Sequence, residues 1–238
     1  MPDATSGLNK KEQVAQMFNN IAENYDFLNH FLSLGIDKGW RKKAIKEASS
    51  VNPTKILDVA TGTGDLAIAA SELRPEKIEG IDIADQMLEI GRKKIAERDL
   101  AKMIELQTAD SISIPFSNNT FDVVMCAYGV RNFEFLEDGL KEMSRVMRSG
   151  GKLVILEFSK PTTFPVKQMF GLYFKFVLPL LGKVFSKHNR AYAYLPESVK
   201  AFPQGAEFCG ILERCGFVKA HARPLTFGIT SLYTAYKP

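Results

Sequence analysis

The feature that most constrains the fold of this chain is an alternation of short apolar runs with helical patterns between residues 54 and 158. TKILDVATGTGDLAIAASEL (54–73) reads as a strand, a glycine-containing turn and a helix. KIEGIDIADQMLEIGRKKIAERDL (77–100) repeats that order, and FDVVMCAYGV (121–130) is a continuous apolar run typical of a strand covered on both faces. Such alternation predicts an α/β fold, with a doubly wound and mostly parallel sheet.

The two ends of the chain depart from this alternation. Residues 10–50 show an apolar period near that of a helix, so residues 1–50 are predicted to form an N-terminal helical cap. GFVKAHARPLTFGITSLYTAYKP (216–238) reads as two strands around a turn, which predicts an antiparallel hairpin at the sheet edge. The main domain is therefore expected at residues 51–238, with an apolar and basic insertion at about 160–203.

Composition bears on where the protein resides, whether it binds a metal and what partners it has. The polar N-terminus, MPDATSGLNKKEQ, has no apolar segment of the kind found in secretory signals, and the three cysteines have no metal-ligand spacing. We expect a cytoplasmic protein with reduced thiols and no metal site. Residues 160–223 hold ten Lys and Arg against three Asp and Glu, which favours an anionic membrane surface or a nucleic acid as a partner, or a solvated basic face.

The first strand-to-helix turn is the candidate cofactor site. Gly62 and Gly64 follow a strand and open a helix, where a ligand of a parallel sheet is expected. Glycine permits close approach because it has no Cβ. Ala67 is tolerated in a dinucleotide fingerprint, so the glycine count alone leaves NAD open.

Four carboxylates around this turn distinguish the cofactor classes. Asp58 and Asp65 flank the glycines, and Asp82 and Asp110 end the next two strands. Crowded acids would repel a pyrophosphate, but they suit the sulfonium and ammonium cations of S-adenosylmethionine. The predicted roles are ribose binding by Asp82, adenine contact by Asp110 and the backbone of Ser111, and passage of Thr61, Gly62 and Gly64 beside the methionine moiety.

Four segments carry a family resemblance that covers residues from about 12 to the C-terminus. They are the pattern Tyr25-Asp26-x-x-Asn29-x-x-x-Ser33-x-Gly35-x-x-x-x-Trp40, RVMRSGGKLVILEF (145–158), YGVRNF (128–133) and YAYLPESVKAFP (192–203). This set resembles the ubiquinone/menaquinone biosynthesis C-methyltransferase family. The resemblance implies a class I methyltransferase (Rossmann-like) fold and methylation of a prenylated hydroquinone at a ring carbon by S-adenosylmethionine.

The resemblance also implies particular cofactor positions and a substrate. Thr61, Asp82, Asp110 and Ser111 match the family's cofactor positions, whereas Ala127 stands where the family often has serine. AYGVRNF (127–133) resembles lineages that make only menaquinone, which favours conversion of demethylmenaquinol to menaquinol in menaquinone biosynthesis. The alternatives are methylation of demethoxyubiquinol in ubiquinone biosynthesis and methylation of another lipophilic small molecule.

Candidate catalytic residues lie where the strand ends and the N-terminal helices are expected to meet. Arg131 could stabilise a phenolate, while Tyr25, Asn29 and Asn132 could position the quinol hydroxyls. Asp26 could hold Arg131 or act as a base; alternatively, Arg131 and Asp26 could form a purely structural ion pair, and Tyr25 could simply pack.

A prenylated quinol resides in a bilayer, so we expect transient contact with a membrane surface, peripheral at the inner face of the cell membrane. Residues 164–185 are too short and too interrupted by lysine and proline to span it, and could form the wall of a tunnel for the prenyl tail or a core insertion. A nucleic-acid partner is not expected, because no Asn-Pro-Pro-aromatic or catalytic-cysteine motif is present. Two possibilities stay open: the protein could be a non-enzymatic scaffold that binds the cofactor, and it could form a homo-oligomer.

Overall fold

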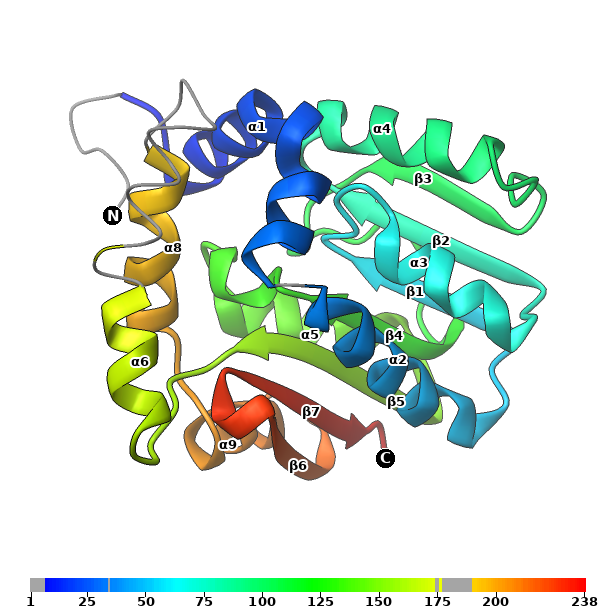
Figure 1. Ribbon diagram of the computed structural model, residues 1–238. Coiled ribbons are helices and arrows are strands. Elements are labelled where there is room, and N and C mark those ends of the chain that lie inside the picture. The colour runs from blue at the N-terminus through cyan, green and yellow to red at the C-terminus, as the bar shows by residue number, and fades with distance from the viewer. Residues whose placement is uncertain (1–6, 34, 174–175, 177–189) are drawn as a thin grey trace.

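In the computed structural model, the described residues form one seven-stranded sheet with the strand order β3-β2-β1-β4-β5-β7-β6 (Figure 1). The structure describes residues 7–33, 35–173, 176 and 190–238, with the side chains of residues 27–32 and 190–193 outside that description. The strands are β1 (Lys55–Val59), β2 (Lys77–Asp82), β3 (Ile104–Thr108), β4 (Phe121–Ala127), β5 (Met147–Phe158), β6 (Val218–Leu225) and β7 (Thr230–Tyr236).

Strands β1 to β5 are parallel, and the C-terminal strands reverse direction. β7 pairs antiparallel with β5, and β6 pairs antiparallel with β7 at the edge of the sheet. Pro224 lacks an N–H and is accommodated in this outer strand, as expected for an edge position. The mostly parallel sheet and the antiparallel hairpin predicted from the sequence are both confirmed.

Helices cover both faces of the sheet. The helices are α1 (Lys10–Leu32), α2 (Ile36–Ala48), α3 (Asp65–Ala70), α4 (Asp85–Ala96), α5 (Leu136–Val146), α6 (Val166–Leu172), α8 (Arg190–Ala201) and α9 (Ala206–Arg214), and a short 3-10 turn, η3, spans Val130–Asn132. Successive strand residues point to opposite faces. In β4, Val124 therefore packs in one core with residues of α5 and α9, and Val123 packs in the other with residues of α2, α3 and α4. Two buried faces explain the uninterrupted apolar run of this strand.

The two N-terminal helices occupy different places. α2 covers the sheet: Trp40 and Ala44 are buried in the same core as strand residues, and the Trp40 indole N–H donates to Thr226 Oγ1 at 2.8 Å. α1 instead contacts α4 and α8, and lies above the carboxyl ends of the strands (Figure 1). The stretch from residue 24 to 40 thus joins a helix over the strand ends to a helix of the sheet's covering layer.

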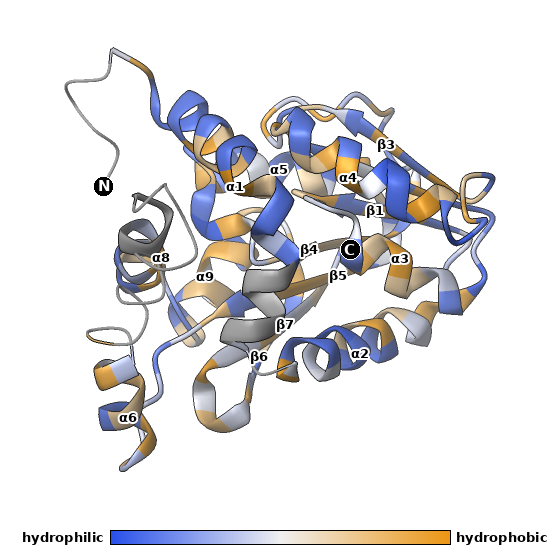
Figure 2. Cartoon of the chain, turned by 45° about the horizontal axis from the view of Figure 1, so that its top comes forward, coloured by the Kyte–Doolittle hydropathy of each residue, from blue (hydrophilic) through white to orange (hydrophobic). Residues whose placement is uncertain are grey.

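The predicted apolar segment, residues 164–185, lies largely outside the described residues. Its described part, α6, lies at the margin of the molecule and carries several hydrophobic residues (Figure 2). Phe164, Met169 and Leu172 are all exposed. In the part of the chain that the structure describes, no helix combines the length and apolar character needed to cross a bilayer.

Candidate active site

The carboxyl ends of β1 and β4 frame a cavity, here called the central cavity, at the point where the strand order reverses. Both strands leave the sheet through a residue with a left-handed backbone, Ala60 (φ 56°) and Tyr128 (φ 60°). Non-glycine residues rarely adopt this conformation, and such strain gathers at functional sites. The described lining is Lys11, Val14, Phe18, Tyr25, Val59, Ala60, Gly62, Ile81, Asp82, Ile83, Met87, Ala109, Asp110, Ser111, Ile112, Ala127, Tyr128, Gly129, Asn132, Phe133, Glu134 and Phe135.

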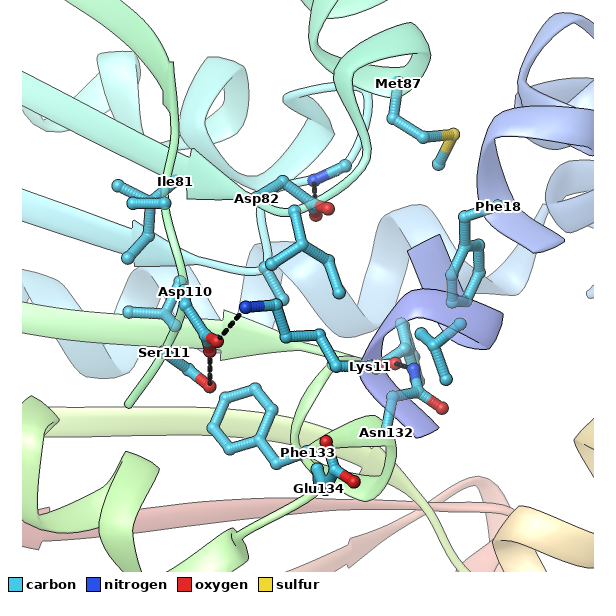
Figure 3. Close-up of a pocket in the computed structure, with 18 of the residues that line it drawn as sticks. Lys11, Phe18, Ile81, Asp82, Met87, Asp110, Ser111, Asn132, Phe133 and Glu134 are labelled. Atoms are coloured by element: carbon cyan, nitrogen blue, oxygen red, sulfur yellow. Dashed lines mark hydrogen bonds and ion pairs between the residues drawn. The ribbon is translucent and has the colours of Figure 1, made fainter. Parts of the chain in front are cut away.

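Asp82 ends β2 and is tied to the glycine turn by backbone hydrogen bonds. The Gly62 N–H donates to Asp82 Oδ2 at 2.8 Å (Figure 3), and the Ala84 N–H donates to Oδ1 at 2.9 Å. Burial raises the pKa of the Asp82 carboxyl, while these two N–H groups act to lower it. Each oxygen of a carboxylate accepts more than one hydrogen bond, so Asp82 can still accept hydroxyl donors from the cavity.

The glycine turn adopts backbone conformations that suit it to a ligand. Gly62 has a φ of 56° and Gly64 a φ of 76°, and a side chain at either position would be strained. The Gly64 N–H donates to the Thr61 carbonyl at 2.9 Å, which closes the turn before α3 begins. The predicted positions Thr61, Gly62 and Gly64 therefore lie together beside Asp82.

Asp58, inside β1, lines a second cavity next to the turn. Thr61 Oγ1 donates to Asp58 Oδ2 at 2.6 Å and the Ala67 N–H donates to the same oxygen at 3.1 Å. Asp58 Oδ1 is buried and has no hydrogen-bond partner among the described residues. Burial raises the pKa of Asp58 to about 7. An unpartnered buried carboxylate oxygen is costly unless a ligand satisfies it, and an ammonium group would do so.

Asp110 and Ser111 line the central cavity just after the end of β3, the strand next to β2. Lys11, from α1, forms an ion pair with Asp110, with 2.8 Å between Nζ and Oδ2 (Figure 3). This contact with the Asp110 carboxylate raises the pKa of Lys11. The two predicted adenine-contact residues are thus in the cavity, but a lysine that the sequence did not single out partners one of them.

Arg131 pairs with Glu157, so the possible pairing of Arg131 with Asp26 is not formed. Arg131 Nη1 donates to Glu157 Oε1 at 2.7 Å and also to the Tyr128 carbonyl, and the Arg131 N–H donates to Glu157 Oε2 at 3.2 Å. The two side chains are only 7% and 0% exposed. Glu157 lies at the carboxyl end of β5, beside the η3 turn, and therefore reaches Arg131.

Asp26 belongs to a different polar cluster. Lys94 Nζ lies 2.7 Å from Asp26 Oδ2 and 2.5 Å from Asp65 Oδ1, and Thr63 Oγ1 donates to Asp26 Oδ1 at 2.6 Å. These contacts tie α1 to α4 and to the glycine turn. Tyr25, the neighbour of Asp26, lines the central cavity. The Asn29 side chain lies outside the described residues.

A third cavity, here called the side cavity, adjoins the central one. Phe133 and Glu134 line both, and Arg131 lines only the side cavity. The described lining combines apolar residues with five charged ones and comprises Lys10, Val130, Arg131, Phe133, Glu134, Leu136, Tyr194, Glu197, Ser198, Lys200, Ala201, Phe202 and Pro203. Arg131 Nε and Asn132 Oδ1 are buried without a hydrogen-bond partner among the described residues. The η3 turn thus carries one unsatisfied donor and one unsatisfied acceptor, which a hydroxylated ligand could satisfy.

Among the polar residues of the site that reasoning from the sequence missed are Glu157, Lys11 and Lys94. Glu157 had a signal, since it is a lone acid in the apolar run KLVILEF (152–158) at a strand's carboxyl end. Lys11 and Lys94 had none, because both lie on ordinary charged helix faces. Within the residues that the structure describes, no group of three or more His, Cys, Asp or Glu side chains is placed to hold a metal ion.

The sequence and the fold of this chain are both similar to those of known methyltransferases. The chain is 52% identical to demethylmenaquinone methyltransferase of Bacteroides fragilis over 96% of this chain and 94% of that protein. It is 43% identical to the ubiquinone/menaquinone biosynthesis C-methyltransferase UbiE of Geotalea daltonii over 96% and 97% of the two chains. Its fold matches a SAM-dependent methyltransferase from Aquifex aeolicus with a TM-score of 0.60 at 19% identity, covering 82% of this chain and 89% of that one.

The family assignment rests on nearly the whole chain. A model of the ubiE/COQ5 methyltransferase family matches residues 6–237, which include the glycine turn, the Arg131 segment and the C-terminal hairpin. The chain therefore belongs to the ubiE/COQ5 methyltransferase family.

Proposed function

We propose that this protein transfers a methyl group from S-adenosylmethionine to a ring carbon of a prenylated hydroquinone, demethylmenaquinol. The observation that carries the proposal is the 52% identity to a relative named demethylmenaquinone methyltransferase over almost the full length of both chains. The polar groups around the glycine turn support the choice of cofactor, and the unpartnered groups around η3 support a hydroxylated acceptor.

The proposed cofactor fits the acids around the glycine turn. S-adenosylmethionine supplies an electrophilic methyl group on a sulfonium cation. Asp82 accepts the ribose hydroxyls, and the unpartnered Asp58 Oδ1 accepts the α-ammonium group. Thr61, Gly62 and Gly64 flank the methionine end, while Asp110 and Ser111 hold the adenine end, with Lys11 beside them.

Around η3, the residues suit a quinol hydroxyl. A phenol with a pKa of about 10 is mostly protonated at neutral pH, so a nearby cation favours the more nucleophilic phenolate. The Arg131 guanidinium supplies that charge from the adjoining side cavity, and Glu157 holds it in place. Asn132 and Tyr25 line the central cavity, where they position the acceptor ring beside the methyl donor. Methyl transfer breaks the sulfur–methyl bond as the ring carbon–methyl bond forms, which leaves S-adenosylhomocysteine. The methylated ring carbon then gives its proton to water, which restores aromaticity.

The prenyl tail requires an apolar path away from the reacting ring. We assign it to the side cavity, whose lining includes Leu136, Tyr194 and Phe202, because this cavity shares a wall with the central one. The exposed apolar side chains of α6 and the basic excess of residues 160–223 support transient contact with an anionic membrane surface, where such a substrate resides. α1 serves as the cap over both cavities.

The experiment is a methyl-transfer assay with purified protein, S-adenosylmethionine labelled in the methyl group, and short-chain quinols. We expect label to enter the ring of demethylmenaquinol, because the relatives' names and the polar groups near η3 both favour this acceptor. Demethoxyubiquinol is the second arm, since a 43% identical relative is named for ubiquinone as well as menaquinone biosynthesis. Label in neither quinol would contradict the proposal. A faster reaction with demethoxyubiquinol would show that this quinol, and not demethylmenaquinol, is the preferred acceptor.

A further inference from the structure

The second cavity beside the glycine turn, here called the turn cavity, holds one cation among its described lining residues. Its lining is Tyr25, Arg41, Asp58, Ala60, Thr61, Gly62, Thr63, Asp65, Leu66, Ala127 and Tyr128. The cavity adjoins the central cavity, because the two share Tyr25, Ala60, Gly62, Ala127 and Tyr128. Its chemistry differs, since two of its residues are aspartates and the lining cation is Arg41.

Arg41 is largely buried and fixed in direction. Its Nη2 donates to Asp37 Oδ2 at 2.6 Å and lies 3.2 Å from Asp65 Oδ2, and the side chain is 12% exposed. Trp40, the neighbouring residue of α2, is buried in the core and anchors this part of the helix. A guanidinium carries five N–H donors, and both of these ion pairs are made by Nη2. Arg41 can therefore accommodate a further carboxylate.

We propose that Arg41 binds the α-carboxylate of the methionine part of S-adenosylmethionine. The inference rests on the proposed cofactor and deepens it. The methionine end is a zwitterion, and Asp58 in the same cavity offers an unpartnered oxygen to its ammonium group. The carboxylate would meet only like charges from Asp58 and Asp65 if the cavity held no cation. Arg41 offsets that repulsion and orients the amino-acid end with a charge-assisted hydrogen bond.

The competing explanation for Arg41 is a purely structural one, in which it only ties α2 to α3 through Asp65. The two explanations differ in which ligands should bind more weakly when Arg41 is replaced. A structural role disturbs the whole turn and weakens every adenosyl ligand. A carboxylate-binding role weakens only ligands that carry the carboxylate.

The test compares two ligands by isothermal titration calorimetry. One is S-adenosylhomocysteine, and the other is its decarboxylated analogue, which keeps adenosine, the sulfur and the amino group. In Arg41→Ala we expect the Kd of S-adenosylhomocysteine to rise about tenfold or more, which corresponds to about 1.4 kcal/mol per factor of ten. The Kd of the decarboxylated analogue stays the same or falls, because its ammonium group no longer faces a positive neighbour.

Two further variants keep the result decisive. Lys42→Ala removes one positive charge from the exposed side of the same helix and should leave both Kd values unchanged. Arg41→Lys keeps the charge and should recover part of the binding of S-adenosylhomocysteine; if Arg41→Ala does not fold, Arg41→Gln takes its place. Equal weakening of both ligands, or no weakening of either, overturns the proposal. Failure of the methyl-transfer assay would leave this binding comparison intact.

Discussion

The two sides of the site are built in different ways. Around the glycine turn, polar groups are held by near neighbours and by strand ends that the sheet aligns: Thr61 binds Asp58 three residues away, and the Gly62 N–H binds Asp82 from the adjacent strand. Around η3 and α1, the groups are held by side chains of other elements, as in the contacts of Asp26 on α1 with Lys94 on α4 and of Arg131 on η3 with Glu157 on β5. The first side follows from topology, and the second depends on individual side-chain partners.

Breaking the buried Arg131–Glu157 pair, on the side around η3 and α1, gives the largest expected effect, and the effect is on stability. Glu157→Ala leaves the buried Arg131 charge without its partner, so we expect the free energy of unfolding to fall by about 3–5 kcal/mol. Unfolding in urea measures this change in the free energy of unfolding. The control is Glu137→Ala, which removes an exposed ion pair with Arg214 and should cost about 1 kcal/mol or less. Similar small losses in both variants would mean that the pair does not hold this side together.

Asp82→Ala gives a smaller effect, on the side built from the sheet. The ribose loses its acceptor and the Gly62 and Ala84 N–H groups lose theirs, so we expect the Kd of S-adenosylhomocysteine to rise about tenfold or more. Calorimetry measures it. Asp85→Ala is the matched control, because it removes an acid three residues along the chain that does not line the central cavity. An unchanged Kd in Asp82→Ala would refute the ribose role.

The same contrast explains how much the sequence predicted. The mostly parallel sheet, the C-terminal hairpin and the position of Asp82 and Asp110 at strand ends follow from periodicity, because parallel strands bring their carboxyl ends to one edge. The partner of Arg131 did not follow from periodicity. Nothing in the spacing indicates that η3 turns its arginine towards β5 rather than towards α1, and Asp26 found Lys94 instead. Side-chain pairing across elements depends on how the helices dock, which a local pattern does not encode.

The central claim is that donor binding and acceptor activation are separate tasks of these two sides. The most direct measurement is the Kd of S-adenosylhomocysteine and the turnover of demethylmenaquinol in Arg131→Ala, with Arg131→Lys as the variant that keeps the charge. We expect the Kd to stay within about twofold of the wild type, while turnover falls by about 100-fold or more, as for loss of a group that stabilises developing negative charge. Wild-type turnover, or a Kd that rises in parallel with the loss of turnover, would contradict the separation.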